Sequence, residues 1–522
     1  MNIQKAENRT IKLNEEFYEI ANHHAPALYK EQHVPQEIVT IKKDDDFIHG
    51  CKVSEKQNVD TIEKSDYGKG DTFILDFGDH EVGYFSFKVL PIGSPPDAPL
   101  HLRLTFGEMP IEIFEDFSNY DGWISSSWLQ QETLYVDILP QEIRLPRRYS
   151  FRYVKFEILD TSPKYRVAFN NIKCEYVSSA NQSKIEFIDF QDSELMDLDR
   201  ISIKTLRDCM QDVFEDGPKR DRRLWLGDLR LQALANYDTF KNYELVKRCL
   251  YLFAAVPDEK GRIAANLFLK PTLIADDTYL FDYSLFFTTT LYDYYQETKD
   301  QKTLCDLWPL AYRQLEIALE RLNADGLIED DSSWWSFIDW NEELNKQAPS
   351  QAVLIYALKK GLALANVVDI EKIEMLKNNL NVVENAAKKH LWDQSQGLFI
   401  SGESRQISWA TQVWMILAEV LNHDESQKLM KNLLRENPKI QMNTPYMYHH
   451  FTEALFKLGM KREGISTLKK YWGGMVLHGA DTFWELYNPD DLNYSPYGSH
   501  IINSYCHAWS CTPTYLIRQY LL

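Results

Sequence analysis

The 522-residue sequence lacks the features that mark several large protein classes. Its seven cysteines are an odd number with no CxxC spacing, which argues against a disulfide framework or a zinc ribbon. The N-terminal residues show no apolar signal-peptide core, and no apolar run approaches the roughly 20 residues needed to cross a bilayer. We therefore expect a reduced, cytoplasmic protein that does not bind a membrane.

The sequence also has fewer basic than acidic residues. Lysine and arginine number 57 against 77 aspartates and glutamates, so the net charge is −20. Nucleic acid is recognised by clustered cations that displace counterions, so we expect neither nucleic acid nor a polyanionic substrate as the partner. The sequence contains no HExxH, no glycine-rich phosphate loop and no GxSxG, and we expect no metal, no cofactor and no α/β-hydrolase triad.

Aromatic residues, in contrast, are abundant. The 13 tryptophans and 29 tyrosines exceed what a core usually needs, and such richness is common where sugar rings are stacked. The hydrophobic content of 44% is sufficient for a large core, so disorder is not expected.

The residue pattern of 1–185 predicts β-strands. Six segments alternate apolar and polar residues or carry β-branched and aromatic runs. These segments are TFILDFG (72–78), GYFSFKVLP (83–91), LHLRLTFGE (100–108), ETLYVDILP (132–140), YVKFEILD (153–160) and YRVAFNNIKCEYV (165–177). No helical stretch of comparable strength lies between them, which predicts an N-terminal antiparallel β-sandwich domain.

In residues 186–522 the apolar residues recur instead with the helical period of about 3.6 residues. We predict twelve helical segments, the first over 192–214 and the last over 503–521. The absence of interleaved strands disfavours a (β/α)₈ barrel. Six antiparallel helix pairs closed into a ring would form an (α/α)₆ toroid, with an open helical array as the alternative.

The stretch EDGPKRDRRLWLGD (215–228) lies between the first two predicted helices. We expect Gly217 and Pro218 to end the first helix. Asp216, Asp221 and Asp228 could converge in a compact loop, where the arginines would offset their repulsion. By spacing alone the stretch could equally be a solvated turn with internal salt bridges.

Two later stretches also contain candidate residues. In HGADTFWELYNPDD (478–491), Glu485 stands between bulky apolar neighbours, a partly desolvated setting that suits proton transfer. In SYCHAWSCTPTYLI (504–517), His507 is near the start of the last predicted helix. A helix-end salt bridge for Glu485 and a structural hydrogen bond for His507 are the alternatives.

A further loop, DDSSWWSFIDWNEE (330–343), surrounds Asp339 with aromatic residues. Its aromatic faces could stack on a sugar while Asp339 accepts hydrogen bonds from hydroxyl groups. For Trp335 and Phe337 we favour packing in the core.

Taken together, these stretches resemble the α-L-rhamnosidases of glycoside hydrolase family 78. EDGPKRDRRLWLGD resembles the D-x-P-x-R signature that ends in W-x-G-D, and SFIDWN resembles the family's aromatic–Asp–Trp loop. DTFWELY resembles the late W-E motif and CHAWSCTPTYLI the His-Ala/Gly-Trp-Ser segment. TFILDFGDHEVGYFSFKV and LHLRLTFGE resemble two stretches of the N-terminal sandwich. The resemblance covers almost the whole chain.

The resemblance implies a β-sandwich followed by an (α/α)₆ catalytic domain, and it implies roles for individual residues. Glu485 matches the general base, and Asp216, Asp228 and Arg220 match residues that bind the rhamnose. The remaining expected substrate-binding residues are His507, Asp339 and Trp340, together with the motif tryptophans Trp225 and Trp484.

The proton donor is where the sequence departs from the family. Much of the family reads D-C-P-x-R followed by a glutamate, whereas this chain has Gly217 and no such glutamate. Asp221 stands five residues after Asp216, where members with the shorter spacing place their acid, and we predict Asp221 as the donor. In the longer-spaced members the glutamate falls at the position of Arg222.

The implied reaction is the inverting hydrolysis of terminal α-L-rhamnosyl residues from small rhamnosides. The alternatives are a rhamnoside-binding protein without turnover and another (α/α)₆ enzyme, an epimerase or a lyase. The sequence leaves open whether the chain forms a homodimer through its sandwich.

Overall fold

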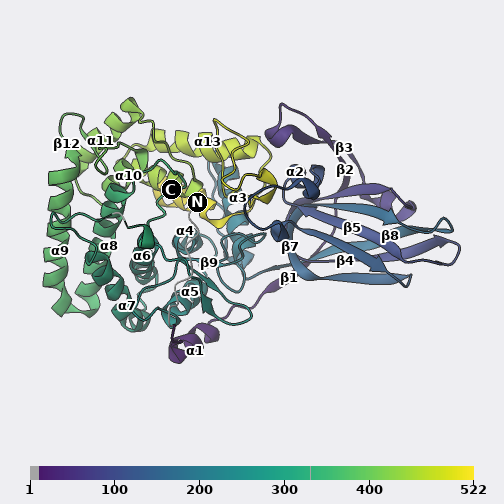
Figure 1. Ribbon diagram of the computed structural model, residues 1–522, viewed down its shortest axis with the longest axis horizontal. Helices are drawn as coiled ribbons and strands as arrows, with labels where there is room; N and C mark the ends of the chain where they lie inside the picture. The colour runs from purple at the N-terminus through teal and green to yellow at the C-terminus, as the bar shows by residue number, and fades with distance from the viewer. Residues whose placement is uncertain (1–10, 330) are drawn as a thin grey trace.

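The computed structural model describes residues 11–329 and 331–522 and shows a β domain beside a larger helical domain (Figure 1). This arrangement confirms the predicted order of an antiparallel sheet domain followed by an (α/α)₆ domain. Residues 1–10 of the first predicted domain lie outside the described residues, and the division between residues 185 and 186 stays a prediction.

The β domain is one antiparallel sheet whose long strands bend. Its strands are β1 (Tyr29–His33), β2 (Glu37–Lys43), β3 (Cys51–Asn58), β4 (Thr72–Gly93), β5 (Leu100–Gly107), β6 (Gln131–Val136), β7 (Gln141–Asp160) and β8 (Tyr165–Ser178). The order is β1-β8-β4-β7-β5-β6, with β2 joining β4 and β3 joining β2. The segments predicted at 72–78 and 83–91 form the single strand β4, whose register against β7 shifts twice. Such shifts bend a strand, so the sheet curves around a phenylalanine-rich core that includes Phe85 and Phe87.

From residue 193 onward, the described residues of the helical domain form twelve α-helices. They are α3 (Ser193–Cys209), α4 (Leu226–Tyr237), α5 (Tyr243–Ala255), α6 (Phe281–Thr298), α7 (Gln301–Leu319), α8 (Gln347–Val368), α9 (Ile373–Ala386), α10 (Trp409–Leu417), α11 (His423–Glu436), α12 (Pro445–Lys457), α13 (Lys461–Leu477) and α14 (Pro513–Tyr520). Contacts run from α4 to α6, α8, α10, α12, α14 and back to α4, so the even-numbered helices form a closed inner ring.

Burial explains which helices are inside. Every residue of α4 is buried, whereas α9 buries only Leu376, Val383 and Ala386. A helix that is buried all round belongs in the interior, and a helix with one apolar stripe covers it from outside. The ring is therefore a toroid and not the open array that the sequence left as an alternative.

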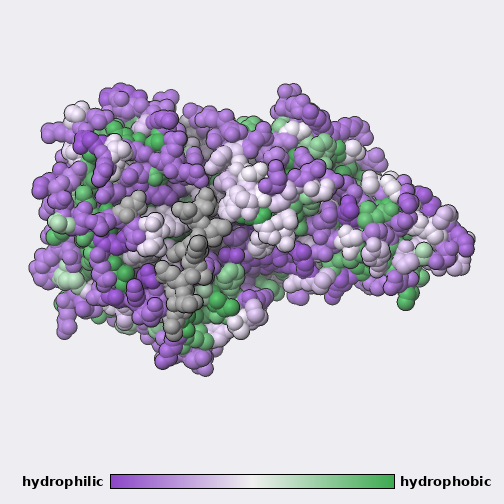
Figure 2. Space-filling view, viewed as in Figure 1, coloured by the Kyte–Doolittle hydropathy of each residue, from purple (hydrophilic) through white to green (hydrophobic). Residues whose placement is uncertain are grey.

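Helix α8 illustrates the same principle. By length and composition it is apolar enough to cross a membrane, and among the described helices it alone meets that test. It packs against α6 and α10, and 61% of its apolar window is buried, as expected for a core helix. The face of the molecule in Figure 2 is mostly hydrophilic, with apolar groups in scattered patches.

Two helix boundaries differ from the predictions. Helix α3 ends at Cys209 and not at the Gly217–Pro218 step, because a β-bridge between Met210 and Phe214 turns the chain first. The last helix begins at Pro513 and not at residue 503. Residues 503–507 are irregular because their backbone groups bind side chains of the site described below.

Smaller elements complete the chain. The short helix α2 (Pro110–Phe114) follows β5, and the short strands are β9 (Leu224–Trp225), β10 (Asn266–Phe268), β11 (Ile274–Ala275), β12 (Trp392–Asp393) and β13 (Leu398–Phe399). Helix α1 (Glu15–His23), which the sequence analysis did not predict, packs against α5 of the helical domain (Figure 1). The described part of the chain therefore contacts the toroid through α1 before it enters the sheet.

A buried ion pair joins the two domains. Lys219, on the 215–228 loop, donates to Glu112 Oε1 of α2 at 2.6 Å and to the carbonyl groups of Ile501 and Asn503. The second oxygen of Glu112 accepts from the backbone N–H of Met109 at 2.9 Å. Both side chains are buried, so each charge depends on the other for its partner.

We expect Lys219→Met to lower the free energy of unfolding by about 3–5 kcal/mol, because it leaves the Glu112 carboxylate buried without its partner. Urea titration followed by tryptophan fluorescence measures the change. The matched control is Lys439→Met, which removes an exposed partner of Glu343 and should cost less than about 1 kcal/mol. Equal effects of the two substitutions would contradict a structural role for the buried pair.

Candidate active site

A cavity of about 480 Å³ opens where the toroid meets the β domain. Eight of the ten predicted site residues line it: Asp216, Arg220, Asp221, Trp225, Asp228, Trp340, Glu485 and His507. They come from loops at one end of the toroid that are up to about 290 residues apart in sequence, and the closed ring brings the first and last of these loops together.

Arg220 is at the centre of the charged cluster. One terminal nitrogen, Nη2, contacts Glu485 Oε2, and the other, Nη1, is 3.6 Å from Asp221 Oδ1. Nε donates to the carbonyl group of Ile502 at 2.8 Å, and the guanidinium lies over the ring of Tyr497 at 4.1 Å. One rigid cation therefore touches both proposed catalytic carboxyl groups, each at a different amino group.

Glu485 is buried, with 3% of the residue exposed, and is held by three donors. Besides Arg220, the Tyr497 hydroxyl donates to Oε1 at 2.6 Å and the Ser504 N–H donates to Oε2 at 3.1 Å. A carboxylate can accept from several donors at once, so this environment suits an ionised glutamate of fixed orientation.

Asp216 organises the 215–228 loop from within. Its carboxyl oxygens accept from the backbone N–H groups of Asp221 and Arg223, each at 3.1 Å. Burial, followed by the charge of Asp221, raises the pKa of Asp216 to about 7. Burial and a neighbouring negative charge both disfavour the ionised form of the Asp216 carboxyl group.

Asp221 and Arg222 lie in different environments. Asp221 lines the cavity with 23% of its side chain exposed, and the Arg220–Asp221 peptide bond is cis. Arg222 adopts a φ of 62°, donates to the carbonyl group of Lys219, and is not among the residues that line the cavity. Positions 221 and 222 were the two candidates for the proton donor. The structure places Asp221, the one with a carboxyl group, in the cavity wall.

Gly217 occupies the position at which much of the family has cysteine, and close packing accounts for the glycine. A Cβ atom there would be 2.5 Å from the carbonyl oxygen of Arg220 and 2.6 Å from Ser504 Oγ. The loop and the 503–507 segment therefore approach too closely for a side chain at this position.

Asp228 and His507 form a buried polar pair, with Asp228 Oδ1 3.2 Å from His507 Nε2. Burial alone would lower the pKa of His507, but the Asp228 carboxylate raises it above its usual range. Within the described part of the chain, His507 Nδ1 and Trp225 Nε1 are buried polar atoms with no hydrogen-bond partner. Both are free to bind hydroxyl groups of a ligand in the cavity.

Two predicted site residues are not in the cavity wall, which corrects the sequence analysis. Asp339 is buried and accepts from the N–H of Asn443 at 2.8 Å and from the Thr444 hydroxyl at 2.6 Å, so it holds two loops together. Trp484 is buried in the core, where its ring packs against Tyr505. A neighbour of a site residue in sequence can point the opposite way when the chain is extended.

Other residues of the cavity were missed. Trp335 and Phe337 pack in or against the core, as expected, but they also line the cavity. So does Tyr497, on a long loop (474–502) whose aromatic content was the available signal, and so do Asp276 and Asp277. Three further residues, Trp123, Ile124 and Trp128, come from the β domain, and no feature of their sequence pointed to the toroid.

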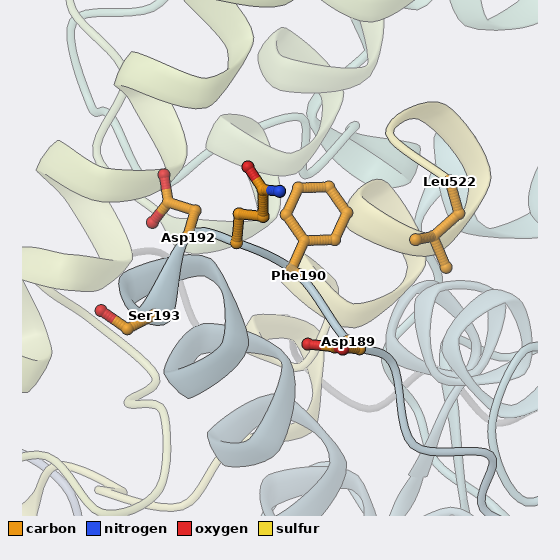
Figure 3. Close-up of a pocket in the computed structure, with 6 residues that line it drawn as sticks. Asp189, Phe190, Asp192, Ser193 and Leu522 are labelled. Atoms are coloured by element: carbon orange, nitrogen blue, oxygen red, sulfur yellow. The ribbon is translucent and has the colours of Figure 1, made fainter.

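Two other places in the molecule carry no comparable chemistry. A hollow between Asp189–Ser193 and the C-terminal Leu522 (Figure 3) contains Asp192, whose carboxyl group already caps α3 and pairs with Lys469. His80, Asp208 and Cys506 are close enough to ligate a metal ion. The ring nitrogens of His80, however, already contact Asp208 at 2.8 Å and Glu108 at 3.2 Å, so we assign no metal there.

Comparison with protein families matches the chain along almost its full length. Residues 35–176 match the N-terminal domain of glycosyl hydrolase family 78 α-rhamnosidases, and residues 183–521 match the bacterial α-L-rhamnosidase six-hairpin glycosidase domain. No curated protein matches the chain.

Solved structures give the same result. A rhamnosidase from Klebsiella oxytoca with rhamnose bound is 48% identical with a TM-score of 0.97, covering 98% of this chain and 100% of that one. A family 78 rhamnosidase of Bacillus sp. GL1 is 23% identical with a TM-score of 0.71, covering 85% and 46% of the two chains. The Streptomyces avermitilis α-L-rhamnosidase complexed with L-rhamnose is 15% identical with a TM-score of 0.64, covering 94% and 44%. The last two show the shared fold.

Proposed function

Because the chain belongs to glycoside hydrolase family 78, the α-L-rhamnosidases, we propose that it hydrolyses terminal α-L-rhamnosyl residues of small rhamnosides with inversion of configuration. The observation that carries the proposal is the contact of one guanidinium, Arg220, with the carboxyl groups of both Asp221 and Glu485 in one cavity. The rhamnose bound to the 48% identical Klebsiella oxytoca protein supports the choice of sugar.

In the proposed reaction, protonated Asp221 donates to the glycosidic oxygen while the C–O bond breaks. Ionised Glu485 removes a proton from the water that attacks the opposite face of the sugar. Inversion requires the two carboxyl groups to stand roughly 6.5–9.5 Å apart, so that the water fits between base and sugar.

The remaining polar groups bind the sugar in this proposal. Asp216 and Asp228 accept from rhamnose hydroxyl groups, and the unpartnered His507 Nδ1 and Trp225 Nε1 take further hydroxyls. A pair of carboxyl groups held in different environments supplies both the acid and the base, so the reaction needs no cofactor.

The test is proton NMR of p-nitrophenyl α-L-rhamnoside hydrolysis, which follows the anomer released first. We expect β-L-rhamnose before mutarotation. Initial α-anomer would contradict inversion, and tight binding without release of sugar would favour a rhamnoside-binding protein. An unsaturated or epimerised product would favour the lyase or the epimerase.

A further inference from the structure

A loop of the β domain reaches the rim of the active-site cavity. It runs from the end of α2 to the start of β6, and its residues Trp123, Ile124 and Trp128 line the cavity. The loop is joined to the toroid by two hydrogen bonds from Trp123. Its backbone N–H donates to the carbonyl group of Tyr497 at 3.1 Å, and its indole Nε1 donates to that of Pro496 at 2.8 Å.

Trp123 is fixed at its polar edge but open on its face. The residue is 49% exposed although both of its N–H groups are bonded. The nearest ring is Tyr497, at 5.9 Å between centroids and tilted by 40°, so it does not cover the indole by stacking. A large apolar ring held in one orientation and left half exposed is a ready surface for another flat ring.

The burial of the neighbouring side chains indicates which part of a substrate would carry such a ring. Asp228, Glu485 and His507 line the cavity and are buried, whereas Asp221 is partly exposed. Under the proposed function the rhamnosyl ring lies against the three buried residues. The group on the other side of the glycosidic oxygen must then extend past Asp221 towards the mouth, where the exposed Trp123 lies.

We propose that Trp123, with Ile124 and Trp128, forms the binding site for the leaving group and accepts a planar aromatic aglycone. This rests on the proposed function. A second sugar would need hydrogen-bonding groups, but the N–H groups of Trp123 are occupied and the carbonyl group of Ile124 already accepts from the Tyr120 hydroxyl at 2.8 Å. The part of this wall that faces the cavity is therefore mainly apolar.

The proposal is tested by steady-state kinetics on phenyl and methyl α-L-rhamnoside, with each variant compared with wild type on the same substrate. For Trp123→Ala we expect kcat/KM on the phenyl glycoside to fall about 3- to 10-fold, in line with the strength of aromatic pairs. On the methyl glycoside, and in the inhibition constant of free rhamnose, the variant should remain at the wild-type level. Trp123→Phe, which keeps a ring, should recover most of the loss.

The matched control is Phe187→Ala, which removes an exposed aromatic side chain that does not line the cavity and should leave both substrates unaffected. Equal losses of kcat/KM on both substrates would show that Trp123 acts by holding Tyr497 in place. Unchanged kinetics on the phenyl glycoside would show that Trp123 does not contact the phenyl ring. Either result overturns the proposal.

A binding measurement separates this inference from the proposed function. Calorimetric titration of intact phenyl α-L-rhamnoside into Glu485→Gln and into the double variant Trp123→Ala/Glu485→Gln requires no turnover. Weaker binding by the double variant supports the aromatic site even if the wild-type protein proves to hydrolyse nothing. Equal affinities would overturn the site whatever the activity.

Discussion

Glu485→Gln is expected to reduce kcat on p-nitrophenyl α-L-rhamnoside by about 10²–10⁴-fold, the range typical for loss of a general base. The amide oxygen can replace Oε2 as acceptor from the Ser504 N–H, and the Tyr497 hydroxyl can turn to accept from the amide NH₂, but the amide cannot take a proton from the attacking water. Steady-state kinetics at saturating substrate measures the effect.

The fold and the sugar site should survive this substitution. Circular dichroism and the affinity for free rhamnose serve as controls, since glutamine is close to glutamate in size and shape. Turnover within a few-fold of wild type would remove Glu485 from the role of base. Loss of rhamnose binding together with turnover would instead indicate that Glu485 holds the Arg220 cluster in place.

Asp221→Asn is expected to show a loss that depends on the leaving group. A poor leaving group such as methanol needs its oxygen protonated as the bond breaks, so kcat/KM on methyl α-L-rhamnoside should fall about 10²–10⁴-fold. An activated leaving group such as 2,4-dinitrophenolate departs without a proton, so the same variant should lose far less on that substrate.

The matched control is Asp276→Asn, because Asp276 also lines the cavity and pairs with Arg223 at 3.6 Å. Asp276 has no part in proton transfer in the proposed reaction, so its loss should lower kcat/KM by the same factor on both substrates. If the dependence on the leaving group appears with Asp276→Asn and not with Asp221→Asn, the proton donor has been assigned to the wrong aspartate.

The two-domain organisation was readable from the sequence because it rests on periodicity. Alternation along β4 and β8 and the 3.6 period of the later helices are local properties that burial imposes on every element. The end of α3 was misplaced because a local bridge between Met210 and Phe214 turns the chain, and the start of α14 was misplaced because long-range contacts set it. The backbone of Ser504 and Tyr505 leaves helical geometry to bind Glu485 and Glu108, residues far away in sequence.

The candidate site could likewise be predicted only in part from the sequence. The resemblance to family 78 singled out Asp216, Arg220, Asp221, Asp228 and Glu485, and the structure gathers all five in one cavity. Asp339 and Trp484 stand beside site residues in sequence, but side-chain direction turns them into the core, and residue types alone carry no information on direction.

The sequence by itself therefore determined the fold class, the family and most of the charged residues of the site. Only the tertiary structure decided that Arg220 contacts both carboxyl groups, that Asp221 and not Arg222 faces the cavity, and that Trp123 of the β domain lies at its rim. The reason is physical: each of these facts depends on distances between segments that are remote along the chain, and packing of the toroid and the sheet sets those distances.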